Sequence, residues 1–132
     1  MKRILLFVSA LWMGAMSLFA TDTTCFPHRL LCDYLENPLG IDNPNPRLSW
    51  QLNDSRQGAK QTAYQIWVGT DSLEVVNEKG NQWNTGKQLS DKTLLSYKGE
   101  ALQPFTKYYW KIKVWDRDGV SSHSAIHTFE TG

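Results

Sequence analysis

Cysteine is scarce in this sequence, because Cys25 and Cys32 are the only two among 132 residues. If both lie on one extended strand, their Cα atoms are about 23 Å apart, whereas a disulfide needs Cα atoms within about 7 Å. A bridge would require residues 26–28 to turn the chain back. We therefore expect two free thiols, with Cys32 packed inward as a small apolar residue.

An excess of charge of one sign is also missing, since 14 Lys and Arg residues face 13 Asp and Glu residues. Such a chain has no basic field to recruit nucleic acid or anionic lipid. Internal repeats, low-complexity tracts and long helix-period segments are absent as well, and only residues 72–78 favour a short helical turn. The six Trp, five Tyr and five Phe residues are enough to fill the core of a small sandwich.

Long apolar runs are confined to the N-terminus. Lys2 and Arg3 precede an apolar stretch, and LFA at 18–20 is an acceptable cleavage site for a secretory signal. A membrane anchor or a buried helix is the alternative, but the run is interrupted and shorter than the roughly 20 apolar residues of a membrane span. We predict a signal peptide at 1–20, a linker at 21–28 and one β-sandwich at 29–132. Export to the periplasm or the cell exterior follows, with no membrane contact after cleavage.

Residues 102–115, LQPFTKYYWKIKVW, have the alternating pattern of one long strand. Because successive residues of a strand point to opposite faces, one set lines the core and the other faces outward. The inward set is Tyr108, Trp110, Ile112 and Val114, and the outward set is Tyr109, Lys111, Lys113 and Trp115. The spacing of Leu102, Pro104, Thr106 and Tyr108 predicts a tyrosine corner, in which the Tyr hydroxyl bonds to upstream backbone.

Turn signals divide the remaining chain into short strands, which we expect at 29–35, from 48, and at 62–70, 82–88, 94–97 and 125–131. With the long strand these make an all-β, seven-stranded immunoglobulin-like or fibronectin type III-like sandwich. Trp110 stands where an immunoglobulin domain has its second cysteine, which favours the type III variant without an inter-sheet disulfide. Between the first two strands, Asn37, Asn43 and Asn45 precede proline and should be extended. Gly40 should allow a turn with positive φ.

The run DYLENPLGIDNPNPRLSWQL at 33–52 is the most specific in the chain. It closely resembles the N-terminal β-sandwich module of secreted bacterial α-L-rhamnosidases, with Asp33 in place of the usual Glu. The same module is matched by KQTAYQI at 60–66, WNTGK at 83–87, YYWK at 108–111, VWD at 114–116 and FETG at 129–132. The resemblance implies neighbouring domains of a glycoside hydrolase as partners. It also implies that the catalytic carboxylates lie on a later domain, so no catalytic or cofactor-binding residue is assigned here.

Two local patterns suggest metal binding at first sight. Asp116-x-Asp118-Gly119 resembles the start of a calcium loop, but position twelve is His127, which cannot supply a bidentate carboxylate, and a hairpin turn explains Asp-Gly better. His123 and His127 would be about 13 Å apart on a strand. We therefore predict no metal site, and we expect the acidic residues to be solvated surface.

The outward aromatic residues Trp67, Tyr109 and Trp115 support three interpretations. They cover a surface that packs against a neighbouring domain, they form a weak carbohydrate-binding platform, or the chain is a stand-alone adhesion sandwich. We favour the docking face, because lysines lie between the rings. Since nothing follows Gly132, we expect a non-catalytic fragment of a truncated glycoside hydrolase, which is not an enzyme by itself.

Overall fold

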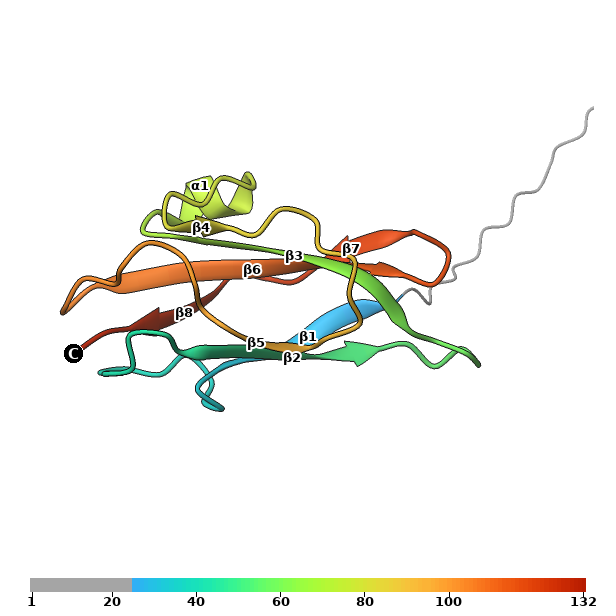
Figure 1. Cartoon of the computed structure of the whole chain (residues 1–132), viewed down its shortest axis with the longest axis horizontal. Helices are drawn as coiled ribbons and strands as arrows, with labels where there is room; N and C mark the ends of the chain where they lie inside the picture. The colour runs from blue at the N-terminus through green and yellow to red at the C-terminus, as the bar shows by residue number, and fades with distance from the viewer. Residues whose placement is uncertain (1–24) are drawn as a thin grey trace, which may run out of the picture.

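Two antiparallel β-sheets are stacked in a computed structural model that describes residues 25–132 (Figure 1). The first sheet has the order β1-β2-β5, and the second has the order β4-β3-β6, with β7 and β8 both pairing with β6. The predicted signal peptide and residues 21–24 lie outside the described residues. The strands are β1 (Phe26–Cys32), β2 (Arg47–Asn53), β3 (Gln61–Gly69), β4 (Trp83–Asn84), β5 (Leu94–Ser96), β6 (Lys107–Asp116), β7 (Ser121–His123) and β8 (His127–Glu130), with one short helix, α1 (Ser72–Val76).

Strand β6 runs through the middle of the second sheet, and its inward residues are those that the alternation predicts. Tyr108, Trp110, Ile112 and Val114 are each at most 1% exposed. The tyrosine corner is also confirmed, because the Tyr108 hydroxyl accepts a hydrogen bond of 2.7 Å from the Gln103 amide. The long strand is therefore fixed at its start by a bond from one of its own core residues.

The core between the sheets contains a buried polar link. Trp50 of β2 is 3% exposed, and its indole nitrogen donates to the Gln61 side-chain oxygen at 3.0 Å. The Gln61 amide nitrogen donates in turn to the carbonyl oxygens of Ser90 and Lys92, at 3.0 and 2.8 Å. These bonds leave the Trp50 and Gln61 polar atoms satisfied, which a buried amide requires.

The first strand begins earlier than predicted, at Phe26 rather than residue 29, and ends at Cys32 rather than residue 35. Residues 26–28 therefore pair in the sheet and do not form a linker. Its register shifts between His28 and Leu31, where Arg29 has a φ of 52°. This bulge inserts an extra residue and resets the alternation, so that Leu30 and Cys32 point inward.

Eight strands are present where the sequence predicts seven. β7 is the unpredicted strand, and β7 and β8 lie on successive stretches of the same edge of β6. The break between them is held by Ser124, whose hydroxyl accepts from the Ile112 amide at 3.1 Å and donates to the Ala125 carbonyl. The predicted strand at 82–88 is shorter than expected, since β4 covers only Trp83–Asn84.

The proline-rich crossover after β1 follows the prediction at Gly40, whose φ is 72°, but not at Asn37. Asn37 has a φ of 44° instead of an extended conformation, although it precedes proline. Its side-chain oxygen accepts a bond of 3.0 Å from the Thr128 amide, which stabilises a left-handed conformation that Asn tolerates. A tertiary contact therefore overrides the local preference.

Both cysteines are free thiols and both are buried, each 1% exposed. Cys32 packs inward, as predicted, and Cys25 also joins the core cluster. Burial, with the nearby Asp33 carboxylate as a smaller cause, raises the pKa of Cys32 to about 12. The thiol therefore stays protonated at neutral pH and is inert as a nucleophile.

Candidate interdomain surface

The outward face of the second sheet is largely covered by the chain itself. Trp67 is only 2% exposed and Lys111 only 3% exposed, so the prediction of an open face at these two residues is wrong. The connection that contains α1 packs over this face (Figure 1), and Val75 of α1 is fully buried there. The alternation of a strand predicts which sheet face a side chain occupies, but it says nothing of what covers that face.

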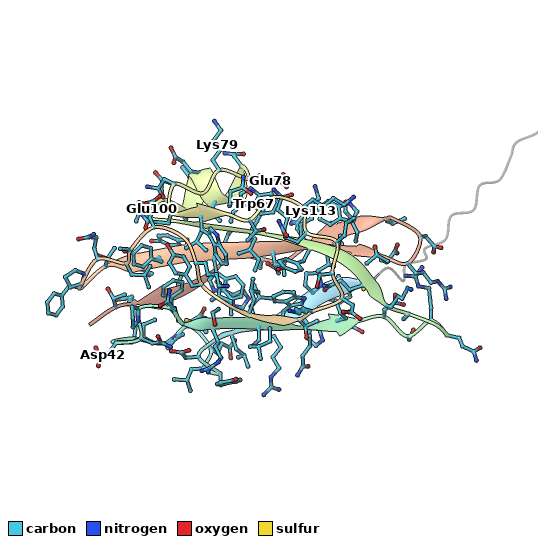
Figure 2. The ribbon with its side chains drawn as sticks, viewed as in Figure 1. Asp42, Trp67, Glu78, Lys79, Glu100 and Lys113 are labelled. Atoms are coloured by element: carbon cyan, nitrogen blue, oxygen red, sulfur yellow. The ribbon has the colours of Figure 1, made fainter. Side chains whose placement is uncertain are left out.

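Lys111 holds this covering segment in place. Its ammonium donates to the Val76 carbonyl at 3.1 Å and lies 3.5 Å from a Glu78 carboxylate oxygen. The same ammonium is 5.4 Å from the centre of the Trp67 ring. Figure 2 shows Trp67 and Glu78 on the α1 side of the molecule. A cation at a helix C-terminus is favourable, so this lysine stabilises the cover rather than facing a partner.

The two remaining outward rings are half-buried and lie against lysines. Trp115 has the Lys87 ammonium 4.5 Å and the Lys113 ammonium 5.4 Å from its ring centre. Tyr109 has the Lys107 ammonium at 5.6 Å. Cations placed over the rings compete with a sugar that would stack there. This face therefore does not offer a row of open aromatic rings.

Two carboxylates are buried, against the expectation that all acids are solvated surface. The side chains of Asp54 and Asp116 are each 2% exposed, and both pair with one nitrogen of Arg56, at 2.6 and 2.9 Å. The hydrogen bonds from Arg56 hold the pKa of Asp54 down at about 2. Burial works to raise the pKa of Asp116, but bonds from the Val120 amide, Arg56 and the Asp118 amide lower it overall.

Asp116 therefore stabilises a turn and takes part in an ion-pair network rather than in a cation site. Its oxygens accept hydrogen bonds from two backbone amides and from Arg56. The turn is the expected hairpin turn, with Gly119 at a φ of 79°. Within residues 25–132, no group of three or more His, Cys, Asp and Glu side chains is arranged to hold a metal ion. In that same part of the chain, no helix is long and apolar enough to cross a membrane.

An exposed apolar surface lies at the end of the sandwich beside Gly132. Leu39 is 74% exposed and Phe105 is 88% exposed. Phe105 has a φ of 52°, which is strained for an aromatic residue, and its amide donates to the Gly132 carbonyl at 3.3 Å. A cleft of about 190 Å³ between Ile41 and Leu102 separates the two loops. We call Leu39, Phe105 and this cleft the end surface.

The family-like motif at 33–52 builds one half of the end surface. Its segment from Pro38 to Ile41 runs beside β8: the Pro38 carbonyl accepts from the Glu130 amide at 2.9 Å, and the Ile41 amide donates to the Glu130 carbonyl at 3.0 Å. The Gly132 amide then donates to the Ile41 carbonyl at 3.1 Å. Figure 1 places the C-terminus at this end, next to the loop that leads into β6. The motif therefore fixes the end of the last strand, which sequence reasoning did not find.

The comparisons with known proteins agree with this architecture. Residues 27–132 match the family described as Rha78A-like, N-terminal immunoglobulin domain. The chain belongs to this family. It is 39% identical over 102 residues to an α-L-rhamnosidase of Streptomyces avermitilis, covering 76% of the chain and 10% of that protein. An α-L-rhamnosidase of Formosa agariphila is 36% identical over 97 residues, which cover 72% of the chain and 10% of the relative.

Solved structures give the same assignment. An α-L-rhamnosidase from Dictyoglumus thermophilum superposes with a TM-score of 0.78 at 39% identity, over 80% of this chain and 12% of that one. The immunoglobulin-like class of this sandwich is thereby established. The chain spans about a tenth of the length of the relatives it matches, so it corresponds to a small non-catalytic part of them. In those proteins, the homologous domain has neighbouring domains.

Proposed function

We propose that this chain is a non-catalytic N-terminal module of an α-L-rhamnosidase-like glycoside hydrolase, and that it packs through its end surface against a following domain. The observation that carries this proposal is the pair of exposed apolar residues Leu39 and Phe105 beside Gly132. The family is described as an N-terminal domain and the match covers only 10% of the Streptomyces avermitilis relative, which supports a following domain that joins at this end.

The backbone at Phe105 supports a binding role for its side chain. A non-glycine residue with positive φ costs about 1 kcal/mol or more, and such strain is found most often at functional sites. Here it places an aromatic ring almost entirely in solvent, where the isolated domain gains nothing from it. Large aromatic residues are the usual anchors of protein interfaces. The end surface thus has both an anchor and an adjacent cleft.

A chimera tests this proposal. Residues 27–132 replace the N-terminal domain of the Streptomyces avermitilis α-L-rhamnosidase, and calorimetry follows the unfolding of the grafted domain. Docking should raise its Tm above that of the isolated chain, by about 4–8 °C for each kcal/mol of contact. The double variant Leu39→Asn with Phe105→Asn should remove this increase, because Asn cannot fill an apolar contact; at Phe105 it also tolerates the positive φ.

A matched control separates docking from folding. Leu89→Asn changes another residue that is 84% exposed, away from Gly132, and should leave the Tm of the grafted domain unchanged. In the isolated chain, Leu39→Asn and Leu89→Asn should each alter stability by at most about 0.5 kcal/mol, as is usual for exposed positions, and Phe105→Asn should not destabilise it, because Asn tolerates the positive φ. The proposal is wrong if the double variant and Leu89→Asn behave alike in the chimera.

Export of the chain is part of the proposal. It rests on the basic pair at Lys2 and Arg3, the apolar stretch after it and the LFA sequence at 18–20. Fusion of residues 1–30 to a phosphatase that folds only outside the cytoplasm should give activity, and replacement of residues 4–8 by polar residues should abolish it. A cytoplasmic, uncleaved fusion would contradict export.

A further inference from the structure

A groove of about 460 Å³ opens on the flank of the sandwich where the two sheets part. One wall is the edge of the second sheet, and the other is β5 at the edge of the first. Tyr64 lies in the groove and is 8% exposed, and the half-buried Trp83 packs edge-on against Tyr97 with ring centres 5.1 Å apart. The lining is mixed, with residues Tyr64, Trp83, Thr85, Gln88, Lys92, Leu94, Leu95, Ser96 and Lys98.

The groove carries positive charge without any compensating carboxylate. Lys92 and Lys98 line it, and no Asp or Glu does. Unlike Lys111 and Lys113, neither of these lysines forms an ion pair with any residue of the described part of the chain. They flank β5 and are six residues apart, which is about 20 Å along an extended chain. A ligand that satisfies both ammonium groups is therefore elongated and negatively charged.

Two hydroxyl groups of the groove are also without a hydrogen-bond partner in the described part of the chain. The hydroxyls of Tyr108 and Tyr97 bond to backbone groups, whereas those of Tyr64 and Ser96 form no hydrogen bond with residues 25–132. Burial raises the pKa of Tyr64, so its hydroxyl remains a neutral donor. Hydroxyl groups beside an indole ring suit sugar hydroxyls and the apolar face of a sugar ring.

We propose that this groove binds an acidic oligosaccharide, in which carboxylates of uronic acid residues pair with Lys92 and Lys98 while a sugar ring lies against Trp83. An acidic peptide would pair with backbone groups at a strand edge, and the titration below distinguishes it from a sugar. The hydroxyls of Tyr64 and Ser96 and the indole of Trp83 favour the oligosaccharide. None of its lining residues belongs to the end surface, so this inference goes beyond the proposed function and is tested separately.

The test is a titration of the purified chain with an oligogalacturonate of four to six units, followed by amide chemical shifts. The controls are the same oligosaccharide as its methyl ester, which lacks the charge, and an oligoglutamate peptide. We expect saturable binding with Kd below about 1 mM, shifts centred on β4 and β5, and weakening by added salt because exposed charges are screened. The methyl ester should bind at least about tenfold more weakly, since two charge pairs are lost.

Variants identify the groups responsible. Lys92→Gln and Lys98→Gln should each weaken binding about threefold or more, as loss of one exposed ion pair predicts. Tyr64→Phe removes only the hydroxyl and should also weaken it. Lys79→Gln changes an exposed lysine that Figure 2 shows on the α1 side of the molecule, and it should have no effect. Absence of saturation, equal binding of the methyl ester, tighter binding of the peptide, or shifts centred outside β4 and β5 would each overturn the proposal.

Discussion

Among residues 25–132, Trp110 is the largest fully buried side chain. It is 1% exposed and belongs to a core cluster that includes Leu30 and Leu48 of the first sheet and Phe129 of the second. It stands two residues after the corner tyrosine, as the fourth of the ten residues of β6. A large aromatic residue in this position contributes by area and by tight packing, because interiors are as dense as organic crystals.

Replacement of this tryptophan should therefore be costly. Trp110→Ala should lower the free energy of unfolding by about 3–5 kcal/mol, the usual range for removal of a buried large aromatic side chain. The measurement is urea unfolding followed by circular dichroism. Trp115→Ala, which removes a half-buried tryptophan of the same strand, is the control and should cost clearly less. Equal losses of unfolding free energy for both variants would show that Trp110 does not lie on the buried face of the strand.

Arg56 makes stability depend on pH in a defined range. Its hydrogen bonds lower the pKa of Asp54 from 3.8 to about 2. Because the folded-state pKa lies below the unfolded value, this pair stabilises the fold above about pH 4, and the stabilisation is lost as the pH falls through about 2. Arg56→Gln should make the free energy of unfolding less pH-dependent between pH 4 and pH 2.

Arg47→Gln is the matched control for that experiment, because the exposed Arg47 side chain forms no ion pair within the described residues. Its pH profile should be that of the unmodified chain. If Arg56→Gln has the same slope as the unmodified chain between pH 4 and pH 2, the pair does not couple protonation to folding.

At the scale of elements, the segment that contains α1 acts as a cover for the second sheet. The helix has only five residues and is too short to be stable by itself. It is fixed at its start by Asp71, whose carboxylate accepts from the Leu73 and Glu74 amides at 2.9 and 3.4 Å. Lys111 then binds its last carbonyl, so both ends of the helix are held by side chains.

Loss of the first of these contacts should open the cover locally. Asp71→Ala should destabilise the helix by about 0.5–2 kcal/mol, the typical cost of losing an N-cap. Amide exchange should accelerate from Leu73 to Asn77, and quenching of Trp67 fluorescence should increase. Asp71→Ser keeps a capping oxygen and should behave nearly as the unmodified chain. Unchanged exchange in Asp71→Ala would mean that packing alone holds the helix.

The segment that covers the second sheet is a feature that the sequence pattern does not predict. The period of two correctly places Tyr64 and Ile66 inward, because alternation follows directly from strand geometry. It cannot reveal that Trp67 is buried on the opposite face, since that depends on how a separate segment folds back. The bulge at Arg29 similarly shifts β1, because one extra residue reverses the alternation that follows it. The sequence does not predict the end surface, because its apolar residues lie in loops, outside any periodic pattern.

At the scale of the whole molecule, the buried carboxylates can be compared with what glycoside hydrolysis requires. Glycoside hydrolysis by the usual mechanism needs a pair of carboxyl groups, one of which has a raised pKa and acts as a general acid. Asp54 and Asp116 are brought together by one guanidinium nitrogen of Arg56, at 2.6 and 2.9 Å. Both have lowered pKa values, so neither can serve as that acid near neutral pH.

The purified chain should therefore not hydrolyse a chromogenic α-L-rhamnoside faster than a protein-free blank. The reason is physical: Arg56 holds the buried Asp54 and Asp116 carboxylates ionised, so neither of them supplies a proton to the leaving group. Release of the chromophore is measured between pH 4 and pH 8, and Asp54→Asn and Asp116→Asn are assayed beside the unmodified chain. Turnover that survives repeated purification and disappears in either variant would show that this sandwich has an active site of its own. A contaminating hydrolase would instead give the same rate in all three preparations, and further purification would remove it.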